Sequence, residues 1–417
     1  MGHTLRIAVV GAGISGLSAA WLLSAKHAVT IFEAEGRLGG HANTVDVPLD
    51  EHGGRAFGQC PVDTGFIVYN TASYPNLIAL FEHLGVPTAP SDMSFAVSLD
   101  AGAYEYSGGG LASLVGHASN LARPAHWRLM REIFRFFREA SAIDARETDP
   151  AITLGDWLAA RGYSQAFIHA HIVPMGSAIW STPADEMLAF PFAAFARFFA
   201  NHGLLQTFDR PPWRTVKGGS REYVHRLERA FTGTIVSGNP VAEVRSRVNG
   251  VSITPHNGST QDFDAVVIAC HADEALAIVP GLDAPSKDVL SAFRYASNTA
   301  VLHTDATQMP RRRRLWSSWN YMGGGAGRVS VTYWMNRLQP LATGTDYFVT
   351  LNPTRAIAGH HVVETKIYDH PMFDRRALSA QAKLASLQGR NSIWFAGSYF
   401  GFGFHEDGVQ SGLAAAE

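Results

Sequence analysis

The sequence predicts an α/β protein whose first unit runs strand, glycine turn, helix and strand. The apolar run 5–10 is typical of a buried strand, and it leads directly into Gly11-Ala12-Gly13-Ile14-Ser15-Gly16. A helical pattern follows, and a second apolar run, 27–32, ends on Glu33. This order is that of a parallel β–α–β unit, in which a chain holds the ADP half of a dinucleotide.

Each position in this unit has a physical role in dinucleotide binding. Gly11 permits the tight turn, Gly13 lets the backbone approach the pyrophosphate, and Gly16 lets the helix pack closely on the strand. Ile14-Ser15 begin the helix, where free N–H groups and the positive end of the helix dipole meet the phosphates. Glu33 is placed to accept hydrogen bonds from the adenosine ribose, and its charge disfavours a 2′-phosphate. The sequence therefore predicts FAD or NAD and not NADP.

The residues after the second strand favour FAD. The chain continues Glu33-Ala34-Glu35-Gly36-Arg37-Leu38-Gly39-Gly40-His41. Two adjacent glycines let the main chain pass close to a flat ligand, and a cation at Arg37 offsets phosphate charge. The segment resembles that of the flavin amine oxidase, phytoene desaturase and protoporphyrinogen oxidase superfamily. The resemblance implies that Ala34, Arg37, Gly39 and Gly40 lie along FAD, and that His41, in the place of the commoner arginine, touches the flavin or caps a loop.

The C-terminal segment resembles the same superfamily. Residues 392–397 are typical of a buried strand, and the run from His405 is typical of the start of a helix. The resemblance implies that this helix points at the N1–C2=O edge of the flavin, with the Gly408 and Val409 N–H groups as donors to the reduced ring. It also places Gly397 and Ser398 at FAD, although many relatives have an acid where this chain has Ser398.

A discontinuous two-domain organisation is implied by the resemblance to glutathione-reductase-type FAD domains. The FAD-binding, Rossmann-like domain is expected to comprise residues 1–69, 215–281 and 389–417, with four short strand-like runs between 234 and 270. Val241, in one of these runs, is expected to contact the cofactor. Residues 70–214 and 282–388 are expected to form an α+β substrate-binding domain.

Composition bounds the possible functions. A chain of 417 residues that is 46% hydrophobic can build two sizeable cores, and a net charge of −2 gives no global attraction to nucleic acid. Two cysteines, Cys60 and Cys270, give neither a disulfide framework nor a metal site. With no signal peptide and no long apolar run, we expect a cytoplasmic protein, with peripheral contact at the inner face of the membrane as a further expectation.

The predicted substrate region is rich in aromatic residues. Apolar residues recur at helical spacing in 126–137, and five phenylalanines lie in 188–199. Such stripes more often form a core than a ligand wall. Their number here nevertheless favours an apolar tunnel over a site for a polar amine.

Three segments narrow the resemblance: 174–183, 316–321 and 401–408. Together they resemble a bacterial subgroup of flavin oxidoreductases associated with cyclopropane-fatty-acid-synthase-like methyltransferases. This implies an FAD-dependent oxidoreductase of lipid metabolism that desaturates a methylated, phospholipid-bound fatty acyl group by hydride transfer to flavin N5, with a methyltransferase as partner. The expected substrate contacts are Ser177, Trp180, Trp319 and Tyr321.

Other functions stay open at this stage. Many amine oxidases hold a water with a lysine near flavin N5, and Ala300 stands near that position here, so oxidative deamination is disfavoured. A flavin-dependent fatty-acid double-bond isomerase would return the same hydride to its substrate. A non-catalytic accessory protein would bind lipid or FAD without redox chemistry.

The candidate catalytic residues are His405, Tyr399 and Glu406. His405 would move protons beside the flavin, or it is a buried, hydrogen-bonded histidine. Residues 63–66 are expected to pack near the cofactor. The basic run 311–314 is predicted as a solvated loop or, alternatively, as a contact for anionic phospholipid.

Overall fold

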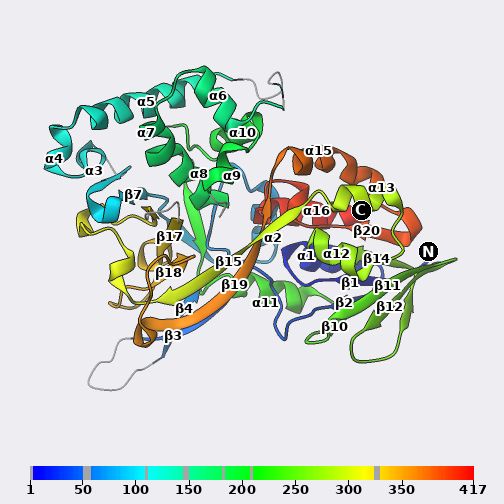
Figure 1. Ribbon diagram of the computed structural model, residues 1–417. Coiled ribbons are helices and arrows are strands. Elements are labelled where there is room, and N and C mark those ends of the chain that lie inside the picture. The colour runs from blue at the N-terminus through cyan, green and yellow to red at the C-terminus, as the bar shows by residue number, and fades with distance from the viewer. Residues whose placement is uncertain are drawn as a thin grey trace.

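The computed structural model describes residues 3–49, 58–108, 111–143, 149, 151–180, 184–206, 210–323 and 329–417. It confirms the predicted mixed α/β fold with a parallel sheet (Figure 1). That sheet has five strands in the order β10-β2-β1-β14-β20, and all its neighbours are parallel. Its strands are β1 (Arg6–Val10), β2 (Ala28–Phe32), β10 (Thr234–Val236), β14 (Ala265–Ile268) and β20 (Ile393–Phe395).

Helices cover one face of the parallel sheet, and a small antiparallel sheet with further helices covers the other. On the first face α1 (Ile14–Ser24) packs along α16 (His405–Ala416) and against α11 (Arg221–Ala230). On the second face the buried core joins the sheet to the meander and to three further helices. These elements are β11 (Val241–Arg247), β12 (Gly250–Pro255), β13 (Gln261–Phe263), α12 (Ala272–Ile278), α13 (Ala284–Leu290) and α15 (Arg375–Leu384).

A second, seven-stranded sheet has the order β19-β15-β18-β17-β16-β7-β8. Its neighbours are antiparallel except for the parallel pair β16 and β7. Its strands are β7 (Phe95–Leu99), β8 (Tyr104–Ser107), β15 (Arg294–His303), β16 (Trp319–Gly323), β17 (Val329–Trp334), β18 (Phe348–Leu351) and β19 (Val362–Met372). There are two further small sheets among the described residues: β3 (Thr44–Pro48) with β4 (Gln59–Asp63), and β5 (Val68–Asn70), β9 (Trp213–Val216) and β6 (Thr88–Ser91).

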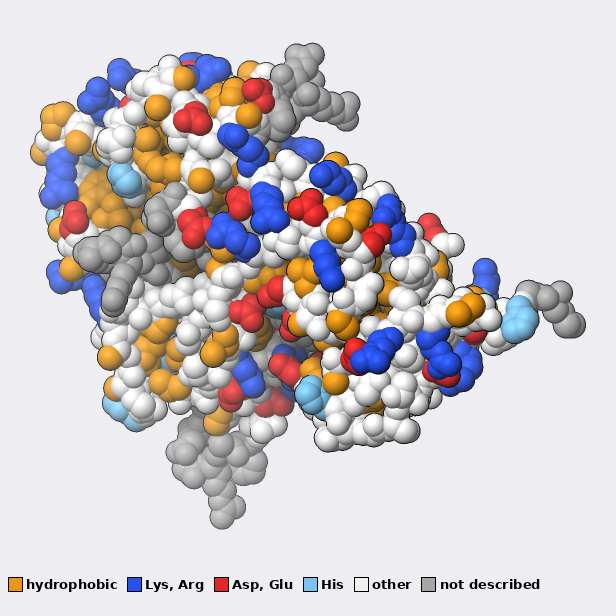
Figure 2. All heavy atoms as spheres, turned by 45° about the vertical axis from the view of Figure 1, so that its right-hand side comes forward, with side chains coloured by type: hydrophobic (Ala, Val, Ile, Leu, Met, Phe, Trp, Pro, Cys, Tyr) orange, Lys and Arg blue, Asp and Glu red, His pale blue; other side chains and the backbone are white. Residues whose placement is uncertain are grey.

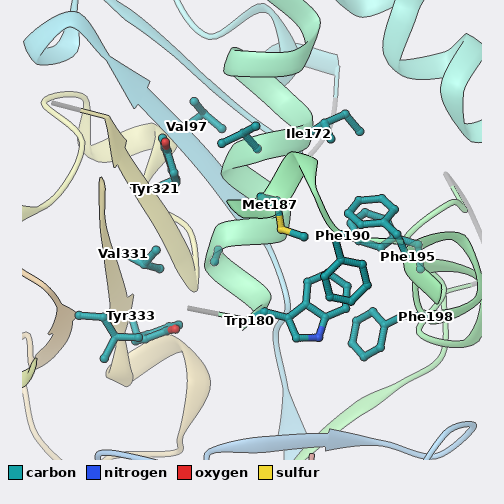
Figure 3. Packing of buried hydrophobic residues seen from close by; sticks show 14 of the residues in the cluster. Val97, Ile172, Trp180, Met187, Phe190, Phe195, Phe198, Tyr321, Val331 and Tyr333 are labelled. Atoms are coloured by element: carbon teal, nitrogen blue, oxygen red, sulfur yellow. The ribbon is translucent and has the colours of Figure 1, made fainter. Parts of the chain in front are cut away.

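The helices between residues 75 and 201, together with α14, complete the fold. They are α2 (Pro75–His83), α3 (Leu111–Val115), α4 (Ala118–Leu121), α5 (Pro124–Ser141), α6 (Leu154–Ala160), α7 (Gln165–Phe167), α8 (Val173–Trp180), α9 (Ala184–Leu188), α10 (Phe192–Asn201) and α14 (Met335–Leu338). One buried core joins α5 to α10 with the seven-stranded sheet (Figure 3). None of the described helices is long and apolar enough to cross a bilayer. The division into a cofactor domain and a substrate domain stays a prediction.

The residues of the two predicted aromatic stripes differ in burial. In α10 and the turn before it, Phe190, Phe195 and Phe198 are all buried, so this stripe forms core. In α5 the stripe is split, because Trp127 is 51% exposed and Phe134 is 46% exposed. Trp127 and Phe134 therefore belong neither to the core nor to a buried ligand wall.

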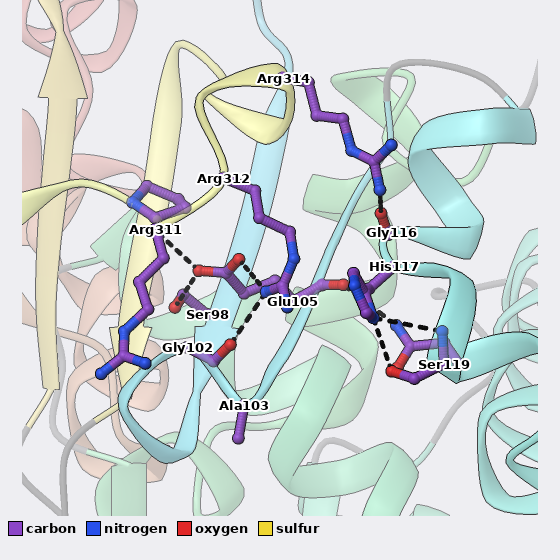
Figure 4. A network of polar contacts seen from close by, with 12 residues as sticks. Ser98, Gly102, Ala103, Glu105, Gly116, His117, Ser119, Arg311, Arg312 and Arg314 are labelled. Atoms are coloured by element: carbon purple, nitrogen blue, oxygen red, sulfur yellow. Dashed lines mark hydrogen bonds and ion pairs between the residues drawn. The ribbon is translucent and has the colours of Figure 1, made fainter.

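The basic run is exposed at Arg311, Arg313 and Arg314 and half-buried at Arg312. Arg312 forms an ion pair of 2.6 Å with Glu105, whose side chain is fully buried in β8 (Figure 4). Arg313 pairs with Asp346 at 2.8 Å, and Arg314 donates to the Gly116 carbonyl at 2.6 Å. Because three of the four guanidinium groups are bound to nearby parts of the protein, this segment fastens the β7–β8 hairpin and the α3–α4 connection.

Candidate cofactor and substrate site

The glycine turn before α1 leaves open space at one glycine only. Gly13 is the N-cap residue of α1 and, as a glycine, has no side chain that could cap the helix. A Cβ atom added to Gly13 would meet no atom within 4 Å. At Gly11, whose φ is 102°, an added Cβ lies 2.8 Å from the Ala269 carbonyl oxygen, and at Gly16 it collides with the Gly11 carbonyl. The first and third glycines therefore serve packing, while Gly13 borders a cradle beside the uncapped helix N-terminus.

Glu33 lies beside this cradle, just after β2. Its carboxylate accepts hydrogen bonds from the Ala12 N–H at 2.6 Å and the Glu35 N–H at 2.8 Å. Burial raises the pKa of Glu33, and those backbone donors oppose the shift. The carboxylate is thus fixed in place at the position that the sequence predicts for a ribose contact.

The predicted glycine pair lies directly against the turn. The Gly39 N–H donates to the Ala12 carbonyl at 2.8 Å, and a Cβ added to Gly40 lies 3.2 Å from the Gly13 Cα. Arg37 is close by, where it pairs with Glu35 at 3.0 Å and retains one third of its exposure. The main chain therefore forms a second wall of the cradle.

Helix α16 reaches the same place because two of its glycines permit close packing on α1. A Cβ added to Gly408 lies 2.8 Å from the Ile14 Cγ2 and 3.0 Å from the Ser15 Oγ, and one added to Gly412 collides with the Ser15 carbonyl. The first turns of the two helices consequently lie side by side. Ser411 fastens α16 to the end of β20, since its Oγ accepts from the Gly397 N–H at 2.9 Å.

The predicted donors of α16 were placed one turn too far along the helix. The Gly408 N–H already donates to the Phe404 carbonyl at 3.1 Å, and Val409 lies one residue further inside the helix. The free N–H groups are those of residues 405–407, because the first turn of a helix lacks intrahelical acceptors. Gly408 and Val409 position the helix and do not supply its donors.

The three candidate catalytic side chains are engaged in structural contacts. The His405 ring stacks on Phe66 with centroids 3.7 Å apart, its Nε2 lies 3.0 Å from the Tyr223 hydroxyl, and burial lowers its pKa to about 3. Glu406 accepts bonds from the Asn76 N–H and the Leu77 N–H, both at 2.9 Å, and so caps α2. His405 therefore matches the structural alternative, and Glu406 has a structural role in place of the predicted catalytic one.

Tyr399 lies away from this group. It is 1% exposed and packs on Phe293, with centroids 5.1 Å apart, in the core on the opposite face of the parallel sheet from α1 and α16. Its catalytic role is corrected to a packing role. Val241 belongs to the same core, and Ser398 follows Gly397 after β20; their contacts with a cofactor stay predictions.

Two histidines near His41 were missed from the sequence. The His41 ring has its centroid 5.5 Å from that of His370 and 6.0 Å from that of His271. Burial lowers the pKa of His41 well below its usual value and that of His370 to about 4, so both rings are neutral near pH 7. The three rings come from segments far apart in the sequence, so no local spacing signals the cluster.

Asp63 holds the loop that carries Phe66. Its fully buried carboxylate accepts from the Thr44 hydroxyl at 2.6 Å, the Ser220 N–H at 2.8 Å and the Gln339 amide at 2.8 Å. Burial raises its pKa to about 6. The expected packing of residues 63–66 beside the cofactor site agrees with this network.

These residues fit FAD. The open space at Gly13, the uncapped N-terminus of α1 and the fixed carboxylate of Glu33 match the pyrophosphate and the ribose of its ADP half. The partly buried rings of His41, His271 and His370 add polar groups beside the glycine pair.

An aromatic wall leads from the substrate region to the start of α16. The Phe198 ring lies 4.6 Å from Trp180 and 4.9 Å from Phe404, centroid to centroid, and Phe404 is the N-cap of α16. Figure 3 shows Trp180 and Phe198 facing one another, with Tyr321 on the strand across the core. The four predicted substrate residues share this region, because α8, with Ser177 and Trp180, packs on β16, which carries Trp319 and Tyr321. Their contact with substrate stays a prediction.

The sequence holds five lysines, and all of them lie in the described residues. None is buried: Lys26, Lys217, Lys287, Lys366, Lys383. Ala300 pairs across the strands with Lys366, which is 41% exposed and forms an ion pair with Glu364 at 3.3 Å. The described site therefore encloses no lysine that could hold a water.

Comparisons with known proteins agree on the fold. The family model of flavin containing amine oxidoreductases matches residues 14–363. The CLA-producing fatty acid isomerase from P. acnes has a TM-score of 0.67 at 14% identity, and cyclohexylamine oxidase from Brevibacterium oxydans has 0.68 at 15%; in both cases 99% of this chain and 98% of the other are covered. Putrescine oxidase bound to putrescine scores 0.67 at 16% identity, with the same coverage. No curated protein sequence matches the chain significantly.

Proposed function

The chain belongs to the family of flavin containing amine oxidoreductases and is an FAD-dependent oxidoreductase, and from this premise we propose that it removes hydride from a long apolar chain. The proposed substrate is a methylated fatty acyl group on a phospholipid, and the product is the desaturated chain. A membrane-associated lipid pathway and a methyltransferase partner belong to the same proposal. They rest on the three sequence segments that resemble the methyltransferase-associated subgroup; residues 181–183 of these segments lie outside the described structure.

The aromatic wall is the observation that carries this proposal. Rings contact one another from Trp180 through Phe198 to Phe404, which immediately precedes the first turn of α16. A wall built of rings would bind a hydrocarbon chain through apolar burial. Arg197, which lies over the Phe402 ring at 5.1 Å, is a cation and would repel an ammonium group.

The residues around the cofactor would divide the work of binding and orientation. The uncapped N–H groups of α1 would hold the pyrophosphate, and Glu33 would hold the ribose. Bound FAD supplies a hydride acceptor at N5. The N–H groups of residues 405–407 would stabilise negative charge on the reduced flavin ring. The stacked pair of His405 and Phe66 would exclude water from this end of the site.

A redox-neutral fatty-acid double-bond isomerase is the second candidate. The same apolar wall suits its substrate, and one protein of similar fold is a fatty acid isomerase. An isomerase would return the hydride to the chain, whereas a desaturase would keep it on the cofactor until an external acceptor removes it. Amine oxidation is the weaker alternative, because none of the five lysines is buried.

Anaerobic mixing of the FAD-loaded protein with lipid tests the proposal. Phospholipid with a methylated acyl chain should bleach the visible flavin absorbance persistently, and mass spectrometry should detect an acyl product that has lost one H2. Bleaching that reverses without an oxidant, with a product of unchanged mass, would identify the isomerase. Rapid reduction by putrescine or cyclohexylamine, with no response to lipid, would contradict both candidates, and lipid binding without bleaching would indicate an accessory protein.

A further inference from the structure

The outer face of α4 and α5 combines exposed apolar side chains with arginines. Leu121 and Trp127 are each 51% exposed and Phe134 is 46% exposed. They account for half of the six exposed large hydrophobic residues among the described positions. The Trp127 Nε1 donates to the Leu121 carbonyl at 3.0 Å, which fixes the ring at the surface. We call this surface, with Arg123, Arg128, Arg131 and Arg138, the apolar-basic face.

The charge of this face has one sign. Residues 118–138 contain five arginines and a single acid, Glu132. Glu132 is 5% exposed and is directed inward, where it accepts a bond from the Ser164 hydroxyl. Arg135 is neutralised by Glu139 at 2.7 Å, whereas Arg128, Arg131 and Arg138 form no ion pair with any residue that the structure describes. Figure 2 shows basic and hydrophobic side chains together over this helical region, at the upper left.

The inner face of α5 connects the apolar-basic face with the aromatic wall. Phe136 is fully buried, and its ring lies 6.3 Å from that of Phe195. Phe195 in turn lies 5.8 Å from Trp180, the first ring of the wall that ends at Phe404. Two rings, Phe136 and Phe195, therefore connect the inner side of α5 with Trp180 in the substrate region.

We propose that the apolar-basic face docks on the surface of a bilayer that carries anionic phospholipid. Helices with arginines on one side and tryptophan, phenylalanine and leucine between them lie in the plane of the membrane interface, where the apolar side chains enter the headgroup boundary and the cations meet lipid phosphates. Unpaired arginines beside exposed apolar rings complement this surface in both charge and polarity. The inference rests on the proposed function in one respect, because docking would bring the substrate region to its acyl chains.

The tip of the β11–β12 hairpin provides a matched control surface. Val248 is 99% exposed there and lies beside two arginines. In contrast to those of the apolar-basic face, these arginines are neutralised, Arg245 by Glu243 at 2.7 Å and Arg247 by Asp262. The hairpin thus offers a similar composition without free positive charge.

Co-sedimentation of the FAD-loaded protein with vesicles tests the docking. The basic variant R128S/R131S/R138S, the apolar variant W127S/F134S and the control R245S/R247S/V248S are compared on phosphatidylglycerol-containing and pure phosphatidylcholine vesicles. We expect the basic variant to lose roughly 100-fold in partitioning onto anionic vesicles at low salt, since each cation contributes on the order of 1 kcal/mol. The loss should shrink at high salt. The apolar variant should weaken binding at both salt concentrations, and the control should bind like the wild type.

The outcomes separate the docking from the chemistry. Binding of the basic variant within about two-fold of the wild type, equal binding of the wild type to neutral vesicles, or an equal loss in the control would overturn the proposal. Flavin reduction by the acyl substrate dispersed in detergent should be the same in all variants. Vesicle binding without any flavin reduction by lipid would refute the proposed function alone, and reduction by lipid without vesicle binding would refute the docking alone.

Discussion

The two helices that lie side by side at the cofactor site, α1 and α16, differ in the acidic residues of their first turns. Helix α1 has no acid in its first turn, and its N-cap Gly13 makes no side-chain bond. Helix α16 has two acids there, Glu406 and Asp407, and both are used by the protein itself. The positive end of α1 is therefore free for an anionic ligand, whereas that of α16 is partly offset by carboxylates.

The difference assigns separate tasks to the two helices. Asp407 accepts from the Phe402 N–H at 2.9 Å and the Phe404 N–H at 3.0 Å, so it shapes the loop that ends the aromatic wall. Glu406 fastens the same turn to α2. We infer that α1 binds the charged part of the cofactor and that α16 positions the end of the substrate region. The predictions below test this division.

The largest effect is expected at the N-terminus of α1. G13V should abolish FAD binding while the fold is retained, because the added side chain enters the open cradle and not the protein core. G16V should instead disrupt folding, since its Cβ collides with the Gly11 carbonyl. Flavin absorbance after purification and the circular dichroism of both variants check the contrast. A G13V protein that retains FAD would remove the assignment of α1.

Local sequence predicted the α1 side of the site well. Strand β1, the glycine turn, α1 and Glu33 all lie within the first 33 residues, so their spacing alone encodes their arrangement. The start of α16 at His405 was also confirmed. Its donors were misplaced because the first free N–H groups depend on which residue is the N-cap, and the sequence does not mark Phe404 as one.

Contacts across long separations could not be predicted. Glu406 reaches Asn76 over 330 residues, and Arg312 reaches Glu105 over 207. The sequence indicated a solvated or lipid-binding run at Arg312 and a catalytic role for Glu406, because the partners of both residues lie in distant elements. The same limit explains why His271 and His370 were missed and why the outward orientation of Trp127 and Phe134 was not predicted.

Acid should destabilise the FAD-free protein. Burial lowers the pKa of His370 to about 4, of His405 to about 3 and of His41 well below its usual value, so these rings bind protons only after unfolding. Each such histidine lowers the free energy of unfolding by about 1.4 kcal/mol between about pH 7.5 and about pH 5.5. The loss begins as the pH falls through about 6.5, the pKa of histidine in the unfolded chain. Three further buried histidines act in the same direction: His171, His202, His303.

Three carboxyl groups oppose this trend, Glu33, Asp63 and Asp407, because burial raises the pKa of each. Burial raises the pKa values of Asp63 and Asp407 to about 6, so on acidification these groups take up protons in the folded state before they do so in the unfolded state. Each therefore adds less than about 1 kcal/mol to the free energy of unfolding between about pH 7.5 and about pH 5.5. The histidines outnumber them, and urea unfolding should show a net loss of stability on acidification. H405F should reduce the loss of unfolding free energy between the two pH values by the contribution of one histidine, about 1.4 kcal/mol. Equal stability at both pH values would show that the rings are already protonated in the fold.

Loss of the α2 cap should destabilise the protein without removing the cofactor. In E406Q one of the carboxylate oxygens becomes an amide NH2 that faces the donors of Asn76 and Leu77, at a cost of about 2 kcal/mol. Flavin content should stay at the wild-type level, in contrast to G13V. The exposed Glu228 on α11 provides the control, and E228Q should have no effect. If E406Q lost FAD while keeping its stability, the positioning task assigned to α16 would be wrong.

The smallest effect is expected where α16 meets the end of β20. S411A removes the acceptor of the Gly397 N–H, and the resulting unpaired buried donor should cost about 1 kcal/mol in the free energy of unfolding. The matched change on the neighbouring helix is S18A, because the single bond of the Ser18 hydroxyl to any residue that the structure describes is to the Ser15 carbonyl of its own helix, at 3.1 Å. Replacing such a back-bonded serine by alanine is close to neutral in a helix interior. A larger loss for S18A than for S411A would show that packing between α1 and α16, and not the bond from α16 to the sheet, holds the two N-termini together.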